Sequence, residues 1–526
     1  MTLPAPDDSN IAAFCQLCCD ATLLIIGAEN RMSRKIRKYF CIAPLREIGA
    51  TFLIRQNGGM TRTTLDSFLQ RRGSLDDRLN AGKAERQNVP RSAWADFRIR
   101  TRRSIPIETL RAQATNRAPD LVPVRHARMA ENPFAFFRGG AATMASDLST
   151  LPSPHINVQL CGDMHVSNFG FFSTTERRLV FGINDFDETL PGHFDWDLKR
   201  LTASTMIAAQ HLGKDRRYGG DLIRTMMRAY RRRIMQYAGM PYVELARCFI
   251  DETALLAEEN RIAPSARRIV EKQIAKARKN TNIGAIGKLT IDTPEGRRLI
   301  ENPPLIMHRE RTRHGFIVRD ILDDGLKSYA RSLLSDRRHV LLRYQLIDFA
   351  RKVVGVGSVG TGCWVLYLEG LDIDDPLFLQ HKEAQASVLA PYFPTRRFKT
   401  QGERVVHGQR LIQGAPDIFL GYGTTRENQF YVRQLRDMKG GIAIGENGIG
   451  ADEFSDYARL FGWALANAHA RSGDPAVLAG YCGQGEQLDE ALVRFAENYC
   501  EQNEADYDTF LKAVRSGKLP ASTENL

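Results

Sequence analysis

Apolar residues follow two different periods along the chain. Over about 196–280, 452–471 and 487–515 they recur at intervals of three and four, which predicts helices. Short runs of β-branched and aromatic residues predict strands at 156–160, 179–183, 352–354, 363–368, 377–380 and 430–433. One amphipathic helix, at about 403–420, interrupts the later strands. The pattern therefore predicts an α+β fold: a mostly helical part with two key strands, then a small β-rich part, then helices again.

The same pattern divides the chain into four segments. Residues 1–88 show no regular period, and we expect a poorly ordered basic extension there. Residues 89–345 are expected to form a large, mostly helical lobe and residues 346–440 a smaller β-rich lobe. We expect the helices of residues 441–526 to return to the large lobe.

Charge changes this picture only near the N-terminal end. The 526 residues carry 73 Lys and Arg against 61 Asp and Glu, a formal net charge of +12. Residues 31–118 hold 20 basic and 7 acidic side chains, whereas the rest of the chain holds 53 and 54. This stretch is either part of a poorly ordered leader or an arm for nucleic acid or anionic lipid. We favour the leader because no aromatic residue interrupts the basic run 31–38, and stacking on bases needs aromatic side chains.

Cysteine usage and hydropathy indicate the compartment. The nine cysteines include five that lie far apart in apolar or mixed surroundings, which is typical of reduced thiols. The longest apolar run, from Phe14 to Ala28, is interrupted by Asp20 and is too short to span a bilayer. We expect a cytoplasmic protein without a membrane partner.

Carboxylates and an amide follow the two key strands. Asp163, His165 and Asn168 come after the first strand, and Asp185 and Asp187 end the second. Phosphoryl transfer from ATP needs a carboxylate that orients the acceptor hydroxyl, and an amide and a second carboxylate that hold Mg²⁺. The alternative is that these are ordinary turn residues. Their combination after two strands favours the functional interpretation.

These residues carry a resemblance to known phosphotransferases. Gly162-Asp163-x-His165-x-x-Asn168 resembles the catalytic loop of aminoglycoside phosphotransferases and choline kinases, and the segment 183–187 resembles their metal-binding segment. The resemblance implies that Asp163 is the base, that Asn168 and Asp185 are metal ligands and that Asp187 is a second-metal ligand. His165 would face the transferring phosphate or be structural. Asp197 would brace the loop.

A second resemblance covers more of the chain. The segments 128–139, 159–163, 184–191 and 431–439 are similar to the bacterial family known as domain of unknown function 2252, over roughly residues 88–510. It implies a protein-kinase-like fold of the aminoglycoside phosphotransferase type and leaves the substrate open. Arg138, in the first of these segments, would either position phosphates or pair with a buried acid.

A glycine-rich loop lies about 190 residues after Asp163. Gly355, Gly357 and Gly360 fit both a dinucleotide-binding fold, in which a helix follows, and a kinase phosphate lid, in which a strand follows. The residues after Gly360 have strand character and thus favour the lid. Lys382 lies on a third strand, where a kinase places the lysine that binds the α- and β-phosphates.

The partner of this lysine and the hinge are expected nearby. Glu403, on the following helix, is the candidate acid for Lys382, and the adjacent Glu383 would point to the other face of its strand. Residues 434–441 would form the hinge against the adenine.

In an ordinary kinase the glycine loop and lysine precede the catalytic loop, so the order here is inverted. Either the two groups form independent sites, or the kinase fold is circularly permuted. Residues 460–470 resemble the helix that precedes the catalytic loop in phosphotransferases, which favours the permutation.

We therefore expect an enzyme, an ATP- and Mg²⁺-dependent phosphotransferase acting on a hydroxyl of a small molecule. Three alternatives remain: nucleotidyl transfer (AMPylation) by the same site, a nucleotide-binding pseudokinase with a regulatory role, and a nucleic-acid binder that uses residues 31–118. The last is the least favoured.

Overall fold

The computed structural model divides into two units, residues 1–72 and residues 73–526, and all described residues belong to the second unit. Its described residues are 73–97, 103, 106–257, 264–395, 397–435, 438, 440–441, 443–445 and 448–522. Among these residues, no helix combines the length and the apolar character needed to cross a bilayer. The expected basic extension therefore lies largely outside the described residues.

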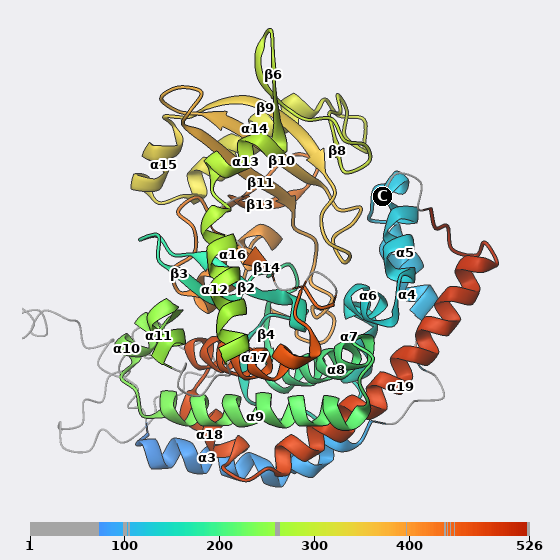
Figure 1. Cartoon of the computed structure of the whole chain (residues 1–526), viewed down its shortest axis with the longest axis vertical. Helices are drawn as coiled ribbons and strands as arrows, with labels where there is room; N and C mark the ends of the chain where they lie inside the picture. The colour runs from blue at the N-terminus through green and yellow to red at the C-terminus, as the bar shows by residue number, and fades with distance from the viewer. Residues whose placement is uncertain are drawn as a thin grey trace, which may run out of the picture. The chain divides into compact units, whose positions relative to one another are not determined.

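The described chain has a helical part and a β-rich part, which lie below and above the middle of Figure 1. Segments from both ends of the chain build the helical part. Its helices are α3 (Leu75–Asn88), α4 (Pro106–Ala114), α5 (Val122–Ala130), α6 (Pro133–Gly139), α7 (Ala141–Leu148), α8 (Asp195–His211), α9 (Arg216–Ala238), α10 (Tyr242–Arg247), α11 (Glu252–Ala257), α12 (Pro264–Lys279), α17 (Ala451–Ser472), α18 (Pro475–Cys482) and α19 (Gln487–Arg515).

Two small antiparallel sheets lie within the helical part. In the first, β1 (Asn157–Leu160) pairs with β4 (Leu190–His193). The second has the order β14-β2-β3-β5. Its strands are β2 (Phe169–Ser173), β3 (Leu179–Ile183), β5 (Ile250–Asp251) and β14 (Gly440–Gly441). Because β2 and β3 form a hairpin, the residues before β2 and after β3 lie close together.

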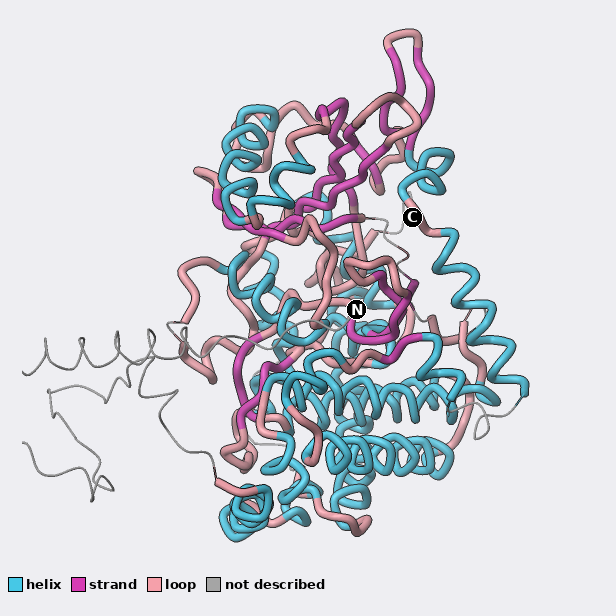
Figure 2. Tube along the Cα trace, turned by 90° about the vertical axis from the view of Figure 1, so that its left-hand side faces the viewer, coloured by secondary structure: helices cyan, strands magenta, loops and turns pink. Residues whose placement is uncertain are grey.

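The β-rich part contains a six-stranded antiparallel sheet of order β12-β13-β11-β10-β9-β8, visible as the strands near the top of Figure 2. Its strands are β8 (Ile306–Met307), β9 (Gln345–Lys352), β10 (Cys363–Glu369), β11 (Pro376–Glu383), β12 (Gly421–Thr424) and β13 (Gln429–Gln434). One face packs against α14 (Val318–Ser332) and α15 (Ser335–Leu341). The other packs against α13 (Asn282–Leu289) and the hairpin of β6 (Thr290–Thr293) and β7 (Gly296–Leu299). Both faces are therefore apolar, as a sheet covered on both sides requires.

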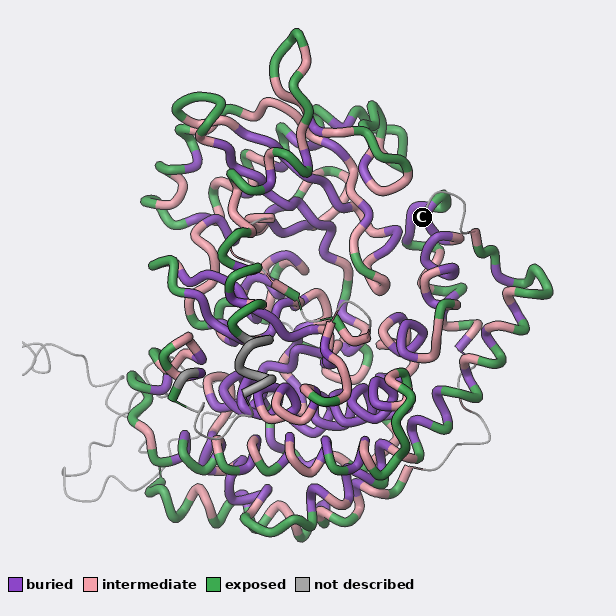
Figure 3. The backbone as a smooth tube through the Cα atoms, in the orientation of Figure 1, coloured by how far each residue is buried: buried purple, intermediate pink, exposed green. Residues whose placement is uncertain are grey.

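One hydrophobic core joins N-terminal and C-terminal segments in the helical part. It runs from Val89 and Trp94 to Tyr499 and Cys500, and it includes the buried faces of α8, α9 and α17. Of the 17 residues of α8, 15 are buried, so this helix lies at the centre of the part (Figure 3). A helix that is buried all round needs neighbours on every side. The C-terminal helices are therefore an integral part of the helical part.

The structure places two of the three boundaries between the four expected segments at other residues. Residues 73–88 do not belong to an irregular extension: Ser74 and Asp77 form a capping box that starts α3, and Arg86 donates to Tyr481 O of α18 at 2.9 Å. The β-rich part begins well before residue 346, because α13, α14 and α15 supply the apolar side chains that cover its sheet. Apolar residues recur with helical period in these three helices, so the sequence pattern alone assigns them to the mostly helical large lobe. α16 (Gln401–Gln413) is shorter than expected.

The packing of the β-rich sheet generates a prediction about acid stability. His381 on β11 is buried against Phe430, with ring centroids 4.0 Å apart, and neither ring nitrogen has a partner among the described residues. Burial lowers the pKa of His381 to about 4. In the unfolded chain the pKa is about 6.5, so the unfolded state takes up the proton first and stability falls between about pH 6.5 and pH 4.

Replacing His381→Leu should make the free energy of unfolding less sensitive to acid. Between about pH 7.5 and pH 5, the wild type should lose about 2 kcal/mol more than the variant in urea denaturation. His339→Leu, at an exposed histidine, is the matched control and should behave like the wild type. Equal pH dependence in His381→Leu and wild type would contradict the uncharged buried imidazole.

Candidate functional site

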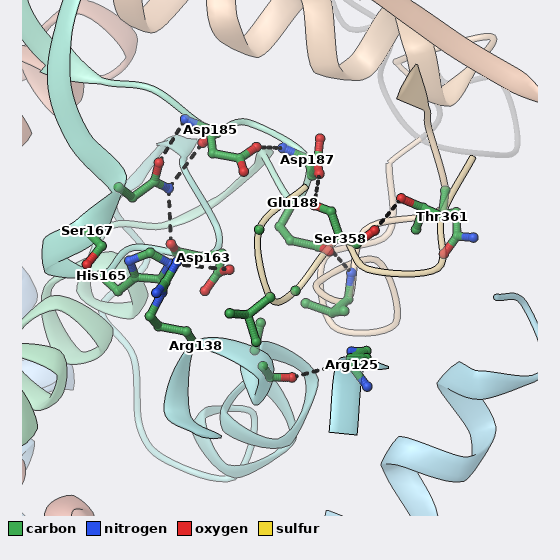
Figure 4. A pocket seen from close by; sticks show the side chains of 18 of the residues that line it. Arg125, Arg138, Asp163, His165, Ser167, Asp185, Asp187, Glu188, Ser358 and Thr361 are labelled. Carbon is green, nitrogen blue, oxygen red and sulfur yellow. Dashed lines mark hydrogen bonds and ion pairs between the residues drawn. The ribbon is translucent and has the colours of Figure 1, made fainter. Parts of the chain in front are cut away.

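The two groups of predicted residues line one cavity of about 480 Å³. One wall comes from the loop that resembles a catalytic loop, residues 161–168 between β1 and β2, and from the segment after β3; the name catalytic loop is kept for residues 161–168. The opposite wall comes from the glycine loop, residues 353–362 between β9 and β10. Figure 4 shows the side chains that meet there. The predicted residues on the lining are Asp163, His165, Asn168, Asp185, Asp187, Gly355 and Gly357.

The catalytic loop is held by the first turn of α8. The carboxylate of Asp197 accepts hydrogen bonds from the backbone N–H groups of Cys161, at 2.7 Å, and Gly162, at 3.0 Å. His469 of α17 lies behind it, with Nε2 3.5 Å from Asp197 Oδ2. Asp197 is 2 % exposed, so these charge-assisted bonds form in a largely dry environment. The expected brace of the loop is confirmed.

Asp163 has one oxygen occupied and one facing the cavity. Arg200 of α8 donates to Asp163 Oδ1 from Nε at 2.8 Å and from Nη2 at 2.5 Å. Asp163 Oδ2 lies 3.9 Å from Nε2 of His165. Burial lowers the pKa of His165 to about 4, despite the nearby carboxylate, so its imidazole is neutral at pH 7. Asp163 and His165 can together orient a hydroxyl group, and the neutral imidazole adds no positive charge to that of Arg200.

Asn168 connects the catalytic loop to the segment after β3 through hydrogen bonds. Its Oδ1 accepts from Asp185 N at 2.8 Å, while its Nδ2 lies 3.2 Å from Asp163 O and 3.3 Å from Asp185 O. Because an amide oxygen has two lone pairs, one remains for a ligand. Asn168 thus combines a structural role with the capacity for the predicted metal contact.

Asp187 joins the two walls of the cavity. Its carboxylate pairs with Lys382 Nζ, accepts from Tyr431 Oη at 2.7 Å and accepts from Ser358 Oγ at 3.0 Å. Lys382 is 2 % exposed. Burial opposes its charge, but the carboxylates of Asp185 and Asp187 outweigh burial and raise the pKa of this amine. Asp187 is an expected metal ligand, but three donors already contact its carboxylate in this structure. A metal ion would have to compete with Lys382, Tyr431 and Ser358 for its oxygens.

The structure does not bring Glu403 to Lys382. Glu403 lies in the first turn of α16, where its carboxylate accepts from the backbone N–H of Lys399 at 2.8 Å. The pairing expected for Glu403 is therefore corrected to Asp187. Glu383 lies on the opposite face of β11 from Lys382, as expected, and accepts from Arg313 at 3.0 Å and from Gly362 N at 2.8 Å.

The glycine loop continues into a strand rather than a helix. β10 begins at Cys363 and pairs antiparallel with β9, so the loop is the turn of a hairpin. Gly355 and Gly360 have φ of 65° and 90°, a region that side chains other than glycine rarely adopt. A Cβ at Gly357 would lie 4.0 Å from Asp163 Oδ2, so the loop passes directly over the catalytic loop. A dinucleotide-binding fold needs a helix directly after the third glycine, and a strand follows here instead.

The carboxylates and the amide are compatible with Mg²⁺ in a nucleotide site. Such sites bind the metal through one or two carboxylates and the substrate phosphates, with water completing an octahedron. Asp185 and Asn168 line the cavity side by side and offer oxygen ligands. No group of three or more His, Cys, Asp or Glu side chains suited to a metal occurs among the described residues. The donor set therefore suits a metal that arrives with phosphates rather than a metal held by protein alone.

Several residues that line the cavity or contact its lining have no clear sequence signal. Arg200 pairs with Asp163, and its only signal was a position three residues after Asp197 on the same helix face. Burial raises the pKa of Glu188 to about 7, and its carboxylate accepts from Val388 N at 2.7 Å. Arg117 and Arg125 also line the cavity. Tertiary packing alone brings these side chains there.

The hinge expected at 434–441 is only partly described. β13 ends at Gln434, and β14 pairs with β2, with Gly440 opposite Phe171. Residues 436, 437 and 439 lie outside the described residues, and so does the end of the 431–439 motif.

Comparison with known proteins gives one match. The family model described as "Uncharacterized protein conserved in bacteria (DUF2252)" matches residues 117–513, which include every residue that lines the cavity except Gln113. No curated protein and no solved structure shows a match to the chain. The match covers well over half of the 526 residues. The chain belongs to this bacterial family, the domain of unknown function 2252.

Proposed function

We propose that the protein is an ATP- and Mg²⁺-dependent phosphotransferase that acts on a hydroxyl group of a small molecule. One observation carries the proposal. Asp163, Asn168 and Asp185 share a cavity with the glycine loop, and Lys382 reaches that cavity's edge through Asp187, although the two groups lie about 190 residues apart in the sequence. Phosphoryl transfer needs these parts within one small volume.

The arrangement supports a protein-kinase-like fold of two lobes in a circularly permuted order. At the end of α17, a Cβ at Gly473 would lie 3.0 Å from Asn157 O and 2.9 Å from Val158 Cγ1, so α17 ends beside the start of β1. In the kinase order the corresponding helix leads directly into the strand before the catalytic loop. Here about 300 residues of sequence separate two segments that adjoin in space. Permutation is tolerated where chain ends fall at surface positions.

The nucleotide would bind between the glycine loop and the segment after β3. The backbone N–H groups of residues 355–360 would face the phosphates, and Lys382, positioned by Asp187 and Tyr431, would contribute positive charge. Bound Mg²⁺, held by Asp185 and Asn168, would neutralise charge that develops on the phosphate oxygens. Ser358 donates to Asp187 and thereby holds the loop close to Lys382.

Asp163 would act on the acceptor. Arg200 holds Oδ1, so Oδ2 is left to accept the hydroxyl proton as the acceptor oxygen attacks the γ-phosphorus. His165 lies beside Oδ2 as a neutral imidazole and can donate one hydrogen bond to the incoming hydroxyl oxygen or phosphate.

The proposal predicts that Asp163→Asn lowers phosphoryl transfer from ATP by at least about 100-fold, because the amide cannot accept the proton. Binding of Mg²⁺-ATP should remain within about two-fold, since Asp163 serves the acceptor side. Turnover is measured with γ-labelled ATP and a metabolite extract, and binding with a fluorescent ATP analogue. Asp323→Asn, on the exposed face of α14, is the matched control.

Two outcomes would contradict this function. Covalent addition of AMP to an acceptor, detected by intact mass, would replace phosphoryl transfer with nucleotidyl transfer. Tight ATP binding with no turnover in the presence of any fraction of the extract would favour the regulatory pseudokinase.

Asp197→Ala should loosen the catalytic loop. Two backbone N–H groups would lose a charged acceptor in a buried environment, which costs about 3 kcal/mol or more. Amide hydrogen exchange of a peptide covering residues 160–168 should accelerate by on the order of 100-fold. Asp195→Ala removes a neighbouring buried carboxylate that pairs with Lys199 instead, so this variant should not accelerate exchange in the loop selectively. Unchanged exchange in Asp197→Ala would show that the brace is dispensable.

A further inference from the structure

Three arginines form a basic wall on the cavity. Arg117 lies between α4 and the 3₁₀ turn at Pro119–Leu121, Arg125 lies on α5 and Arg138 on α6. All three line the cavity that contains Asp163. Arg117 and Arg125 are buried, with exposed fractions of 8 % and 1 %, and Arg138 is half-buried. Together with Arg433, they make this cavity rich in guanidinium groups.

The hydrogen-bonding capacity of this wall is largely unused. Arg125 Nη2 donates to Gly139 O and Gln113 Oε1, both at 3.0 Å, and Arg117 Nη1 donates to Val359 O at 2.5 Å. The side chain of Arg138 makes no hydrogen bond or ion pair to any described residue. Among the described residues, no partner exists for Nε of each arginine or for Nη1 of Arg125.

The charges are also unbalanced. None of the three arginines has a carboxylate of a described residue within ion-pair distance, although Glu188 and Glu383 exert a longer-range attraction on Arg117. Arg117 in turn repels Arg125, and burial lowers the pKa of all three guanidinium groups. A guanidinium nevertheless stays protonated in proteins, and a buried charge without a counter-charge costs several kcal/mol. The wall is therefore arranged for an anion that is not part of the chain.

Guanidinium groups match phosphate oxygens in geometry as well as in charge. Each can form two parallel hydrogen bonds to one phosphate, and three positive charges suit the double negative charge of a phosphomonoester. A single carboxylate would leave most of the unpartnered N–H groups unsatisfied. Phosphate is thus the anion that uses the wall most completely.

The position of the wall points to the acceptor rather than to the nucleotide. Among the charges acting on Arg138, that of Asp163 is the strongest, and the backbone oxygen of Arg138 faces Gly357 beside Asp163 Oδ2. Figure 4 shows Arg138 directly next to Asp163 and His165. The phosphates of a nucleotide would already have Lys382, the glycine loop and Asp185 on the other side of the cavity.

We propose that Arg117, Arg125 and Arg138 bind a phosphate group of the acceptor, so that the substrate is a phosphomonoester with a free hydroxyl group. This inference rests on the proposed phosphotransferase function. The hydroxyl oxygen forms a bond to the γ-phosphorus, the bond from the γ-phosphorus to the β,γ-bridging oxygen breaks, and the hydroxyl proton passes to Asp163 Oδ2. The products are ADP and a bisphosphate.

The first test measures the subsite itself. Inorganic phosphate is titrated calorimetrically into the full chain in the presence of Mg²⁺ and saturating AMP-PNP, which fills the nucleotide side. We expect Arg138→Gln and Arg125→Gln each to weaken phosphate binding by about ten-fold or more, because a charge-assisted hydrogen-bond donor is lost. Binding of a fluorescent ATP analogue should stay within about two-fold. Arg319→Gln, at an exposed position on α14, is the matched control.

The second test measures selectivity. γ-Labelled ATP is offered with matched pairs of acceptors, such as glycerol and glycerol 3-phosphate or ribose and ribose 5-phosphate. A preference of about ten-fold or more in kcat/KM for a phosphorylated member, lost in Arg138→Gln, supports the proposal. Because Arg138 makes no hydrogen bond to a described residue, this variant should keep the thermal stability of the wild type even where Arg125→Gln loses it.

Three results overturn the proposal. The first is equal phosphate binding by the wild type and both variants. The second is a variant that selectively loses affinity for ATP over ADP, which would assign the wall to the γ-phosphate of the nucleotide. The third is a preference for unphosphorylated acceptors. By contrast, arginine-dependent phosphate binding in a chain that binds no AMP-PNP would support the subsite while refuting the proposed use of ATP.

Discussion

The ion pair between the buried Lys382 and the half-buried Asp187 holds the cavity together, because its two members come from different parts of the structure. Lys382 belongs to the sheet of the β-rich part and Asp187 to the segment after β3 in the helical part. Tyr431 and Ser358 complete the coordination of the same carboxylate. Removing the carboxylate of Asp187 would leave the buried ammonium of Lys382 without this partner, and an uncompensated buried charge is destabilising. The distance between the two walls of the cavity therefore depends on this contact.

Three separate stretches of chain then divide the tasks of one site. The helical part presents Asp163 on a loop whose backbone Asp197 fixes, and Asp185 and Asp187 on the segment after β3. The sheet presents the glycine loop and an ammonium group, and α4–α6 add a wall of guanidinium groups. Negative and positive side chains thus face each other across a small volume, and charged groups in such a volume interact more strongly than they would in water. Asp163 of the catalytic loop is paired with Arg200. The three arginines of the wall, by contrast, have no carboxylate of a described residue within ion-pair distance.

Local patterns were sufficient for much of this structure. The strand at 179–183 and the helix at 487–515 have the bounds that their hydrophobic periods predict, and the spacing from Asp163 to Asp185 reflects one loop and one hairpin. The partner of Lys382 could not be predicted in this way, because it depends on how the two parts dock. Glu403 has the expected spacing, but its carboxylate accepts from the backbone N–H of Lys399 just before its own helix. The same holds for α13–α15, whose helical period says nothing about the sheet that they cover.

The contact between the end of α17 and the start of β1 also orders events during synthesis. A ribosome releases the chain from the N-terminus, so β1 and the catalytic loop emerge about 300 residues before the helix against which they pack. Until α17 has left the ribosome, His469 is absent from behind Asp197 and the core around α8 lacks one side. The glycine loop and Lys382 emerge in between. The packing behind Asp197 is thus complete only once α17 (Ala451–Ser472) has been synthesised, long after the loop that it supports.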